Sequence, residues 1–228
     1  MDKGIAMYKI VRMSLIFAAP LMLSAFVTVN EIKVSDWIVC SGGTVEHVSV
    51  EYKGSLPFAE HFIDKVLISV NLSGMKLLDY KKFQETDSLQ YLDLTDTDIK
   101  DLSVISRNLG LKELGLSGTA VKDLKPLAGM NKMKTLDLSY TEVKDISSLK
   151  EMISLEHLSL TGTKVKKLDS LRELKKLNYL DLSGTEISSV KVLTNLKNLR
   201  HLDLTGTNVA VEEVEELSSI NKNLVILK

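Results

Sequence analysis

The chain has 228 residues, of which 44% are hydrophobic but only 5% aromatic, so its core must be built mainly from aliphatic side chains. A formal net charge of −1 gives no electrostatic reason to expect binding to nucleic acid or to an anionic membrane surface. With Cys40 as its only cysteine, the chain can form neither an intrachain disulfide nor a zinc site built from cysteines.

Residues 1–30 have the layout of an export signal. Lys3, Lys9 and Arg12 precede a stretch without charge from Met13 to Asn30, and this order is typical of a secretory signal peptide. The stretch also reaches the roughly 18 residues that a membrane-spanning helix needs. The sequence therefore leaves two alternatives, a cleaved signal peptide or a retained membrane anchor. Both predict that the rest of the chain is exported, to the periplasm, the cell surface or the medium.

Residues 31–66 are predicted to cap the N-terminal end of a stack of repeats. The end of such a stack exposes core side chains unless another segment covers it. Trp37, Phe58 and Phe62 supply large apolar side chains for this purpose. From Val45 onward a degenerate repeat can also be read in the register of the regular repeats that follow.

Residues 67–210 consist of repeats with a period of 22 residues. Each row opens Leu-x-x-Leu-x-Leu, an alternation that predicts a short strand with one buried face. Strands that recur at a fixed period should stack as a parallel sheet, about 4.8 Å apart. The rest of each row has room only for a turn and a short 3₁₀ or α-helical segment, so the stacked rows enclose one aliphatic core. The rows begin at Leu67, Leu89, Leu111, Met133, Leu155, Leu177 and Leu199.

This pattern resembles the 22-residue bacterial leucine-rich repeats that are best known in the internalins. The row from Leu111, with its segment Asp123-Leu124-Lys125-Pro126-Leu127, is the most similar. The resemblance implies an α/β repeat solenoid, a right-handed curved coil with a parallel sheet on its concave face and short 3₁₀ or helical return limbs. It also implies recognition of a protein on the concave sheet. The family's usual Asn is replaced by Thr97, Thr119, Thr141, Thr163, Thr185 and Thr207.

These threonines are interpreted as structural, because a hydroxyl at the corner after the strand can satisfy backbone groups that face inward. The Ser and Thr residues two positions earlier, from Thr95 to Thr205, are interpreted as a second hydroxyl ladder. Residues 211–228 are predicted to close the other end of the stack. In that segment Val211, Val214 and Leu217 have helical spacing, and the final LVILK resembles a strand.

The third and fifth residues of each row should point away from the core and form the concave face. They are mainly Tyr, His and Asp, and Tyr140 follows one of the strands. Aromatic side chains give contact area at little entropic cost, and carboxylates select a basic partner. The residues predicted to bind a partner are Tyr91, Asp93, Asp137, Tyr140, His157, Tyr179, Asp181, His201 and Asp203.

Three kinds of chemical site are conceivable on this face, and the sequence supports none of them. His157, Ser159 and Asp181 could approach one another, but an open sheet offers no oxyanion donors and does not exclude water. His157 and His201 are two rows apart, about 10 Å, which is too far for one zinc ion. Asp181 and Asp203 together fall short of the six to eight oxygens that calcium needs. We therefore predict no enzyme, no metal and no cofactor.

On the outer side, Lys100, Lys122, Lys144 and Lys166 lie in register beside Asp101, Asp123 and Asp145, and we expect the two stripes to neutralise each other. The sequence thus predicts an exported, non-catalytic module that binds an unidentified protein and no nucleic acid. It would touch a membrane only through an uncleaved N-terminal segment. The alternative is a structural envelope protein, tethered by that segment, in which the repeats act as a spacer.

Overall fold

The structure of the chain is a computed structural model, and it describes residues 47–52, 65–74, 83–84, 87 and 89–228. The strands are β1 (His47–Tyr52), β2 (Lys65–Asn71), β3 (Tyr91–Asp93), β4 (Glu113–Gly115), β5 (Thr135–Asp137), β6 (His157–Ser159), β7 (Tyr179–Asp181), β8 (His201–Asp203) and β9 (Val225–Leu227). The 3₁₀ helices are η3 (Leu102–Ile105), η4 (Lys125–Leu127), η5 (Ser147–Glu151), η6 (Asp169–Leu171) and η7 (Lys191–Asn195), and α1 (Val211–Ile220) is an α-helix.

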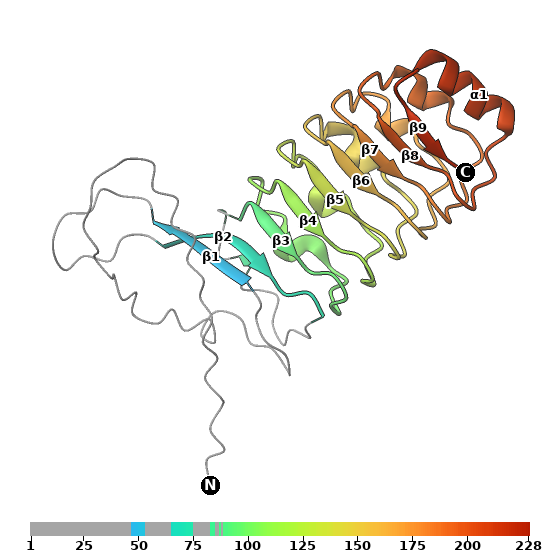
Figure 1. The fold of residues 1–228 in the computed structure, drawn as a ribbon. Coiled ribbons are helices and arrows are strands. Elements are labelled where there is room, and N and C mark those ends of the chain that lie inside the picture. Colours follow the sequence, from blue (N-terminus) through green and yellow to red (C-terminus); the bar gives the residue numbers. More distant parts are fainter. Residues whose placement is uncertain (1–46, 53–64, 75–82, 85–86, 88) are drawn as a thin grey trace, which may run out of the picture.

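The described strands form a single sheet in which they follow one another in sequence order (Figure 1). From β2 to β9 all neighbouring strands are parallel. Equivalent residues of successive rows lie opposite each other, as Leu136 does to Leu158 and Leu158 to Leu180. The predicted period of 22 residues and the predicted parallel sheet are therefore confirmed.

The degenerate repeat read from Val45 is wrong. A further row in the same register would add another parallel strand to the sheet, but β1 runs antiparallel to β2. The register of this pair also shifts between Ser49 and Val50. An antiparallel strand needs no crossover connection, so this segment joins the sheet by a hairpin-like pairing and not as another turn of the coil.

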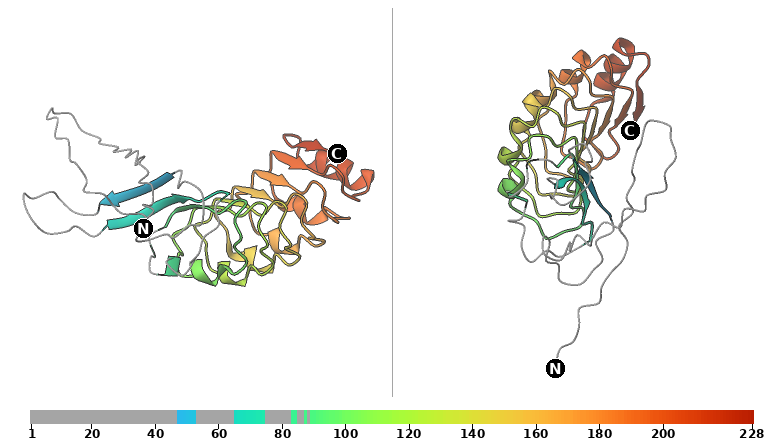
Figure 2. Two further views of the ribbon diagram at one scale, coloured as in Figure 1. Left: turned by 90° about the horizontal axis from the view of Figure 1, so that it is seen from below. Right: turned by 90° about the vertical axis from the view of Figure 1, so that its left-hand side faces the viewer.

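Each coil passes from its strand through a tight turn to a 3₁₀ helix on the opposite side. Figure 2 shows the strands along the inner, concave side of a curved solenoid and the 3₁₀ helices along its outer side. The core between them is made of stacked aliphatic side chains, such as Leu158 and Leu160 from β6 and its turn and Leu171 from η6, all with no exposed surface. Successive coils bury each other's apolar faces, so the core runs continuously along the described repeats.

The corner threonines have the structural role that the sequence predicts. Each hydroxyl donates a hydrogen bond of 2.5 to 2.7 Å to the carbonyl three residues earlier in its own coil, as Thr141 does to Leu138. The backbone N–H of Thr141 points to the same carbonyl at 3.3 Å. The hydroxyl therefore closes the turn after the strand, where it satisfies a buried acceptor.

The C-terminal segment contains a helix and a strand where the pattern predicts them. Leu217 of α1 is buried and Val214 is half-buried, but Val211 is 56% exposed. Glu213 attaches the helix to the last coil, because its carboxylate accepts hydrogen bonds from the Val190 N–H (2.8 Å) and the Ser189 hydroxyl (2.9 Å). Burial raises the pKa of Glu213, but these bonds and the nearby Lys191 ammonium outweigh it, so that pKa is lowered overall.

Residues 1–30, predicted as a signal peptide or anchor, lie outside the described residues, and so do Trp37, Cys40, Phe58 and Phe62. Within the described ranges the structure has no helix with the length and apolar character required for a membrane span.

Candidate protein-binding face

The inner face of the sheet carries two rows of side chains that cross the strands. The alternation of each strand buries its central leucine and turns the residues on either side of it outward, as Tyr179 and Asp181 flank the buried Leu180. Parallel pairing in register then aligns like positions of successive coils. We call His157, Tyr179 and His201 the aromatic row, and Asp137, Asp181 and Asp203 the acidic row.

The rings of the aromatic row are in contact. The Tyr179 ring centroid lies 6.0 Å from that of His157, with the rings stacked at 29°, and 6.2 Å from that of His201. Tyr179 is still 38% exposed, so it is a supported side chain with an accessible surface. Partial burial raises the pKa of the Tyr179 hydroxyl, and the carboxylates of Asp181, Asp203 and Asp137 raise it further.

Each carboxylate of the acidic row is held by the turn that follows its strand. One oxygen accepts a hydrogen bond from the backbone N–H two residues later, at 2.9 Å for Asp137 and 2.8 Å for both Asp181 and Asp203. Such Asx turns stabilise the corner locally. The sequence pattern predicts only partner binding for these aspartates and does not indicate this structural role.

A chain of hydroxyls connects two members of the acidic row. Ser139 is hydrogen-bonded to Asp137 and to Ser159, at 2.5 and 2.6 Å. The chain continues from Ser159 to Thr161, then to Ser183, and ends at Asp181. The predicted hydroxyl ladder therefore exists across these coils, and it includes residues of the strand as well as of the turn.

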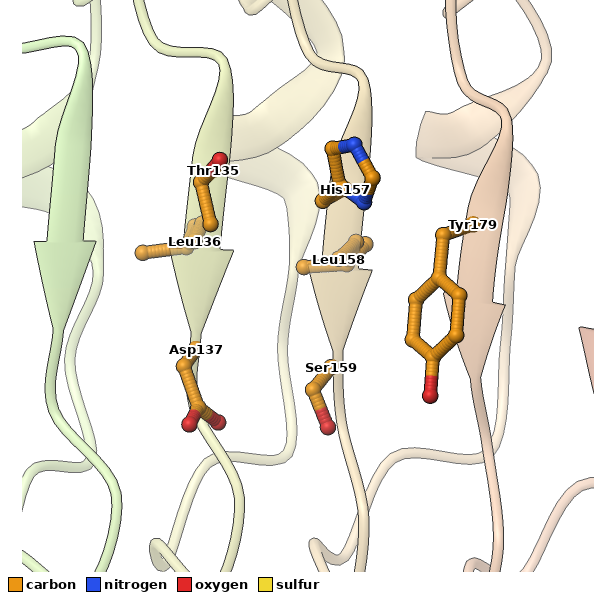
Figure 3. A pocket seen from close by; sticks show the side chains of 7 residues that line it. All are labelled: Thr135, Leu136, Asp137, His157, Leu158, Ser159 and Tyr179. Atoms are coloured by element: carbon orange, nitrogen blue, oxygen red, sulfur yellow. The ribbon is translucent and has the colours of Figure 1, made fainter. Parts of the chain in front are cut away.

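A shallow depression of about 370 Å³ lies over β5, β6 and β7. Figure 3 shows the side chains that line it, with His157 and Ser159 at opposite ends of β6 and Leu158 between them. Ser159 bonds to Ser139 and Thr161, so its hydroxyl is committed to the ladder and not to the imidazole of His157. The arrangement lacks the hydrogen-bonded nucleophile and base that acyl transfer needs.

The described residues contain no group of three or more His, Cys, Asp or Glu side chains placed to hold a metal ion. On the aromatic row, the ring of Tyr179 stands between the two imidazoles.

Two lysines of the outer face form ion pairs with glutamates, whereas the carboxylates of the acidic row form none with the described residues. Lys122 lies 3.2 Å from Glu142, and Lys166 lies 2.8 Å from Glu186. Hydrogen bonds and the positive charges of these lysines lower the pKa of both glutamates. Among the described residues, none of the ion pairs within 4.0 Å includes a member of the acidic row.

The prediction that the neighbouring aspartates neutralise the outer lysines is wrong about which residues pair with them. Asp101, Asp123 and Asp145 accept backbone N–H bonds of 2.8 to 2.9 Å from the residue two positions later, at the start of the 3₁₀ segments. Lys122 and Lys166 instead pair with glutamates of the next coil. Sequence adjacency suggested the aspartates, but stacking of the coils brings the glutamates closer.

Tyr140 stands at the rim of the inner face in a strained backbone conformation. Its φ of 56° is in the left-handed region, where the equivalent position of other coils has Gly162, Gly184 or Gly206. A Cβ atom added at Gly162 would lie 2.9 Å from the Tyr140 ring, so the ring covers that glycine closely. The side chain nevertheless remains 68% exposed. A left-handed conformation costs a residue with a Cβ roughly 1–2 kcal/mol.

We expect Tyr140→Gly to raise the free energy of unfolding by about 1 kcal/mol, because glycine adopts this conformation without steric cost. Chemical denaturation followed by circular dichroism measures the change. Gly184→Ala is the matched control, since its φ is 65° and the added Cβ would meet no atom closer than 3.7 Å. That control should lose about 1 kcal/mol, and a loss of stability in Tyr140→Gly would show that the ring contact on Gly162 outweighs the strain.

The structure brings together six of the nine predicted binding residues, those of the aromatic and acidic rows. Tyr91 and Asp93 are on β3, separated by β4 from Asp137 on β5, and the ammonium of Lys112 lies 6.0 Å from the Tyr91 ring centroid. Val225 and Leu227 were not among the predicted residues, although they lie opposite His201 and Asp203 and are 54% and 56% exposed. The alternation in the final LVILK was a signal for them.

Comparison with solved structures confirms the resemblance to internalin-like repeats. An internalin (inlF) from Listeria monocytogenes has a TM-score of 0.65 and 22% sequence identity, covering 72% of this chain and 50% of that chain. Internalin C2 of the same organism has a TM-score of 0.62 and 28% identity, covering 70% of each chain. A leucine-rich-repeat protein from Leptospira interrogans has a TM-score of 0.55 and 20% identity, covering 64% of this chain and 44% of its own.

This chain thus spans half the length of the first of these structures. No protein-family model matches the sequence, and a search of curated proteins finds no match.

Proposed function

We propose that this leucine-rich-repeat solenoid is an exported, non-catalytic module that binds a protein partner through the inner face of its sheet. The observation that carries the proposal is the difference between the two faces. Lys122 and Lys166 on the outer face pair with glutamates, whereas no ion pair within 4.0 Å among the described residues includes a member of the acidic row. The exposed, stacked ring of Tyr179 lies directly next to these carboxylates.

This combination suits a protein interface. A rigid aromatic side chain loses little entropy on binding and is a frequent centre of binding energy. Carboxylates that are already oriented accelerate association with a basic surface and select against acidic ones. Export is supported by the basic and then apolar composition of residues 1–30.

Exchange of Tyr179→Ala together with Asp181→Asn tests the proposal. Asparagine retains the oxygen that accepts the Ser183 N–H, so the double variant should unfold at nearly the parent's denaturant concentration. Affinity for a partner isolated with the parent protein should fall by about 2 kcal/mol, roughly 30-fold in Kd, if Tyr179 is a hot spot. Isothermal titration calorimetry measures this loss.

Lys144→Ala with Lys166→Ala on the outer face is the control, and it should bind as the parent does. Loss of binding in the outer-face variant with full binding in the inner-face variant would assign the partner to the other side of the solenoid. Fractionation of cells that express the native chain addresses the alternative of a tethered spacer. A spacer would remain in the membrane fraction. In a pull-down, the parent and the inner-face variant would then retain the same proteins.

A further inference from the structure

We infer that the partner segment recognised by the inner face is an amphipathic α-helix lying across the strands, with a basic stripe over the acidic row and an apolar stripe over the aromatic row. This inference rests on the proposed function and specifies the chemistry and the shape of what is bound. Its evidence is the spacing of the two rows and the carboxylates of the acidic row, which form no ion pair within 4.0 Å with any described residue.

The two rows run side by side in the same direction. Tyr179 and Asp181 are two residues apart on β7, which separates the rows by about 7 Å. The aromatic row is continued by the exposed side chain of Val225, which lies opposite His201. A ligand that covers both rows must therefore present two adjacent stripes of different character, one apolar and one cationic.

An extended peptide crossing the strands cannot do this, because its side chains alternate and only one line of them faces the sheet. A helix about 10 Å in diameter presents two neighbouring stripes at once. Helix-in-groove recognition of this kind uses anchors spaced by three and four residues. The width of the double row therefore favours a helix.

The spacing along the acidic row leads to the same conclusion. Asp181 and Asp203 lie opposite each other on neighbouring strands, about 4.8 Å apart, and Asp137 is two strands beyond Asp181, about 14 Å from Asp203. In a helix, residues i, i+3 and i+10 are separated by about 4.5 and 15 Å along the axis and share one side. Apolar residues at i+1, i+4 and i+8 then form the adjacent stripe.

The carboxylates of the acidic row are oriented in a way that allows them to bind cationic side chains of the partner. Each uses one oxygen for the backbone N–H of its turn, which fixes its direction. Within the described residues, the lysines that form ion pairs do so with glutamates and not with this row. Charge complementarity therefore specifies a basic and not an acidic helix.

Two synthetic peptides of 18 residues and identical composition test the inference. One is an alanine-based helix with Lys at positions 4, 7 and 14 and Leu at positions 5, 8 and 12. The other distributes the same Lys and Leu residues evenly around the helix. Titration into the full chain should show that the patterned peptide binds at least tenfold more tightly than the permuted one.

Asp181→Asn with Asp203→Asn should reduce binding of the patterned peptide at least tenfold. Glu142→Gln with Glu186→Gln is the matched control, because it removes the same charge from the outer face and should change nothing. Equal affinity for the two peptides, or no binding of either, would overturn the helical partner. The proposed function would still stand in that case if the isolated protein partner is lost with the Tyr179 and Asp181 exchange. Loss of peptide binding in the Glu142 and Glu186 control alone would contradict both.

Discussion

Removal of one whole period, residues 133–154, should leave a chain that still folds in a single cooperative transition at a lower urea midpoint. In this deletion β6 follows β4, and Leu158 takes the place that Leu136 holds opposite Leu114. Every remaining coil keeps a neighbour of the same shape, so only one coil and one interface between coils are lost. Far-ultraviolet circular dichroism during urea unfolding measures the midpoint and the steepness of the transition.

Removal of only residues 133–143 should abolish that cooperative transition. This half-period deletion eliminates β5 and its corner but keeps η5, so the outer limb of one coil would have to pack against the strand of another. A slip that does not preserve the period exposes the apolar set of the coil to water. Similar unfolding curves for the two deletions would contradict the 22-residue register.

The exchange Leu158→Ala should lower the free energy of unfolding by about 3 kcal/mol, the usual loss when a large buried aliphatic side chain is truncated and leaves a cavity. Leu158 is the central residue of β6, has no exposed surface and lies between Leu136 and Leu180 of the neighbouring coils. Urea denaturation of the variant and the parent gives the difference.

Ile153→Ala provides the control, because Ile153 is 58% exposed in the preceding coil. Its change should remain within about 0.5 kcal/mol. If the two substitutions prove equally costly, the stability of the solenoid does not depend on the stacked leucines in the way that the packing indicates.

Much of the inner face could be predicted from the sequence, for a local reason. In a strand the side-chain direction alternates, so Leu-x-x-Leu-x-Leu is sufficient to place Tyr179 and Asp181 on one face and Leu180 on the other. The fixed period then aligns equivalent positions of successive rows. The fold, its parallel sheet and its 3₁₀ return limbs followed from the same pattern. Which of the exposed residues bind a partner stays a prediction.

Contacts between coils could not be predicted with the same success. The Lys122 ammonium has Asp123 beside it in the sequence but pairs with Glu142 of the next coil. The hydroxyl chain from Asp137 to Asp181 also needs the distances between coils, and the turn after each strand decides that one carboxylate oxygen is used internally. These partners depend on the lengths and directions of side chains in neighbouring coils. The period of the repeat alone does not determine either.

The sequence by itself therefore determined the repeated coil, its register and the composition of each face. The reason is that the periodic burial of leucine is a local property, and the same pattern recurs in every row. Only the tertiary structure decided the conformation at the two ends of the stack. The antiparallel direction of β1 and the return of Val225 to the sheet beside His201 after α1 both occur where the period is interrupted. At such positions no neighbouring row supplies a template, and packing against the existing stack selects the conformation.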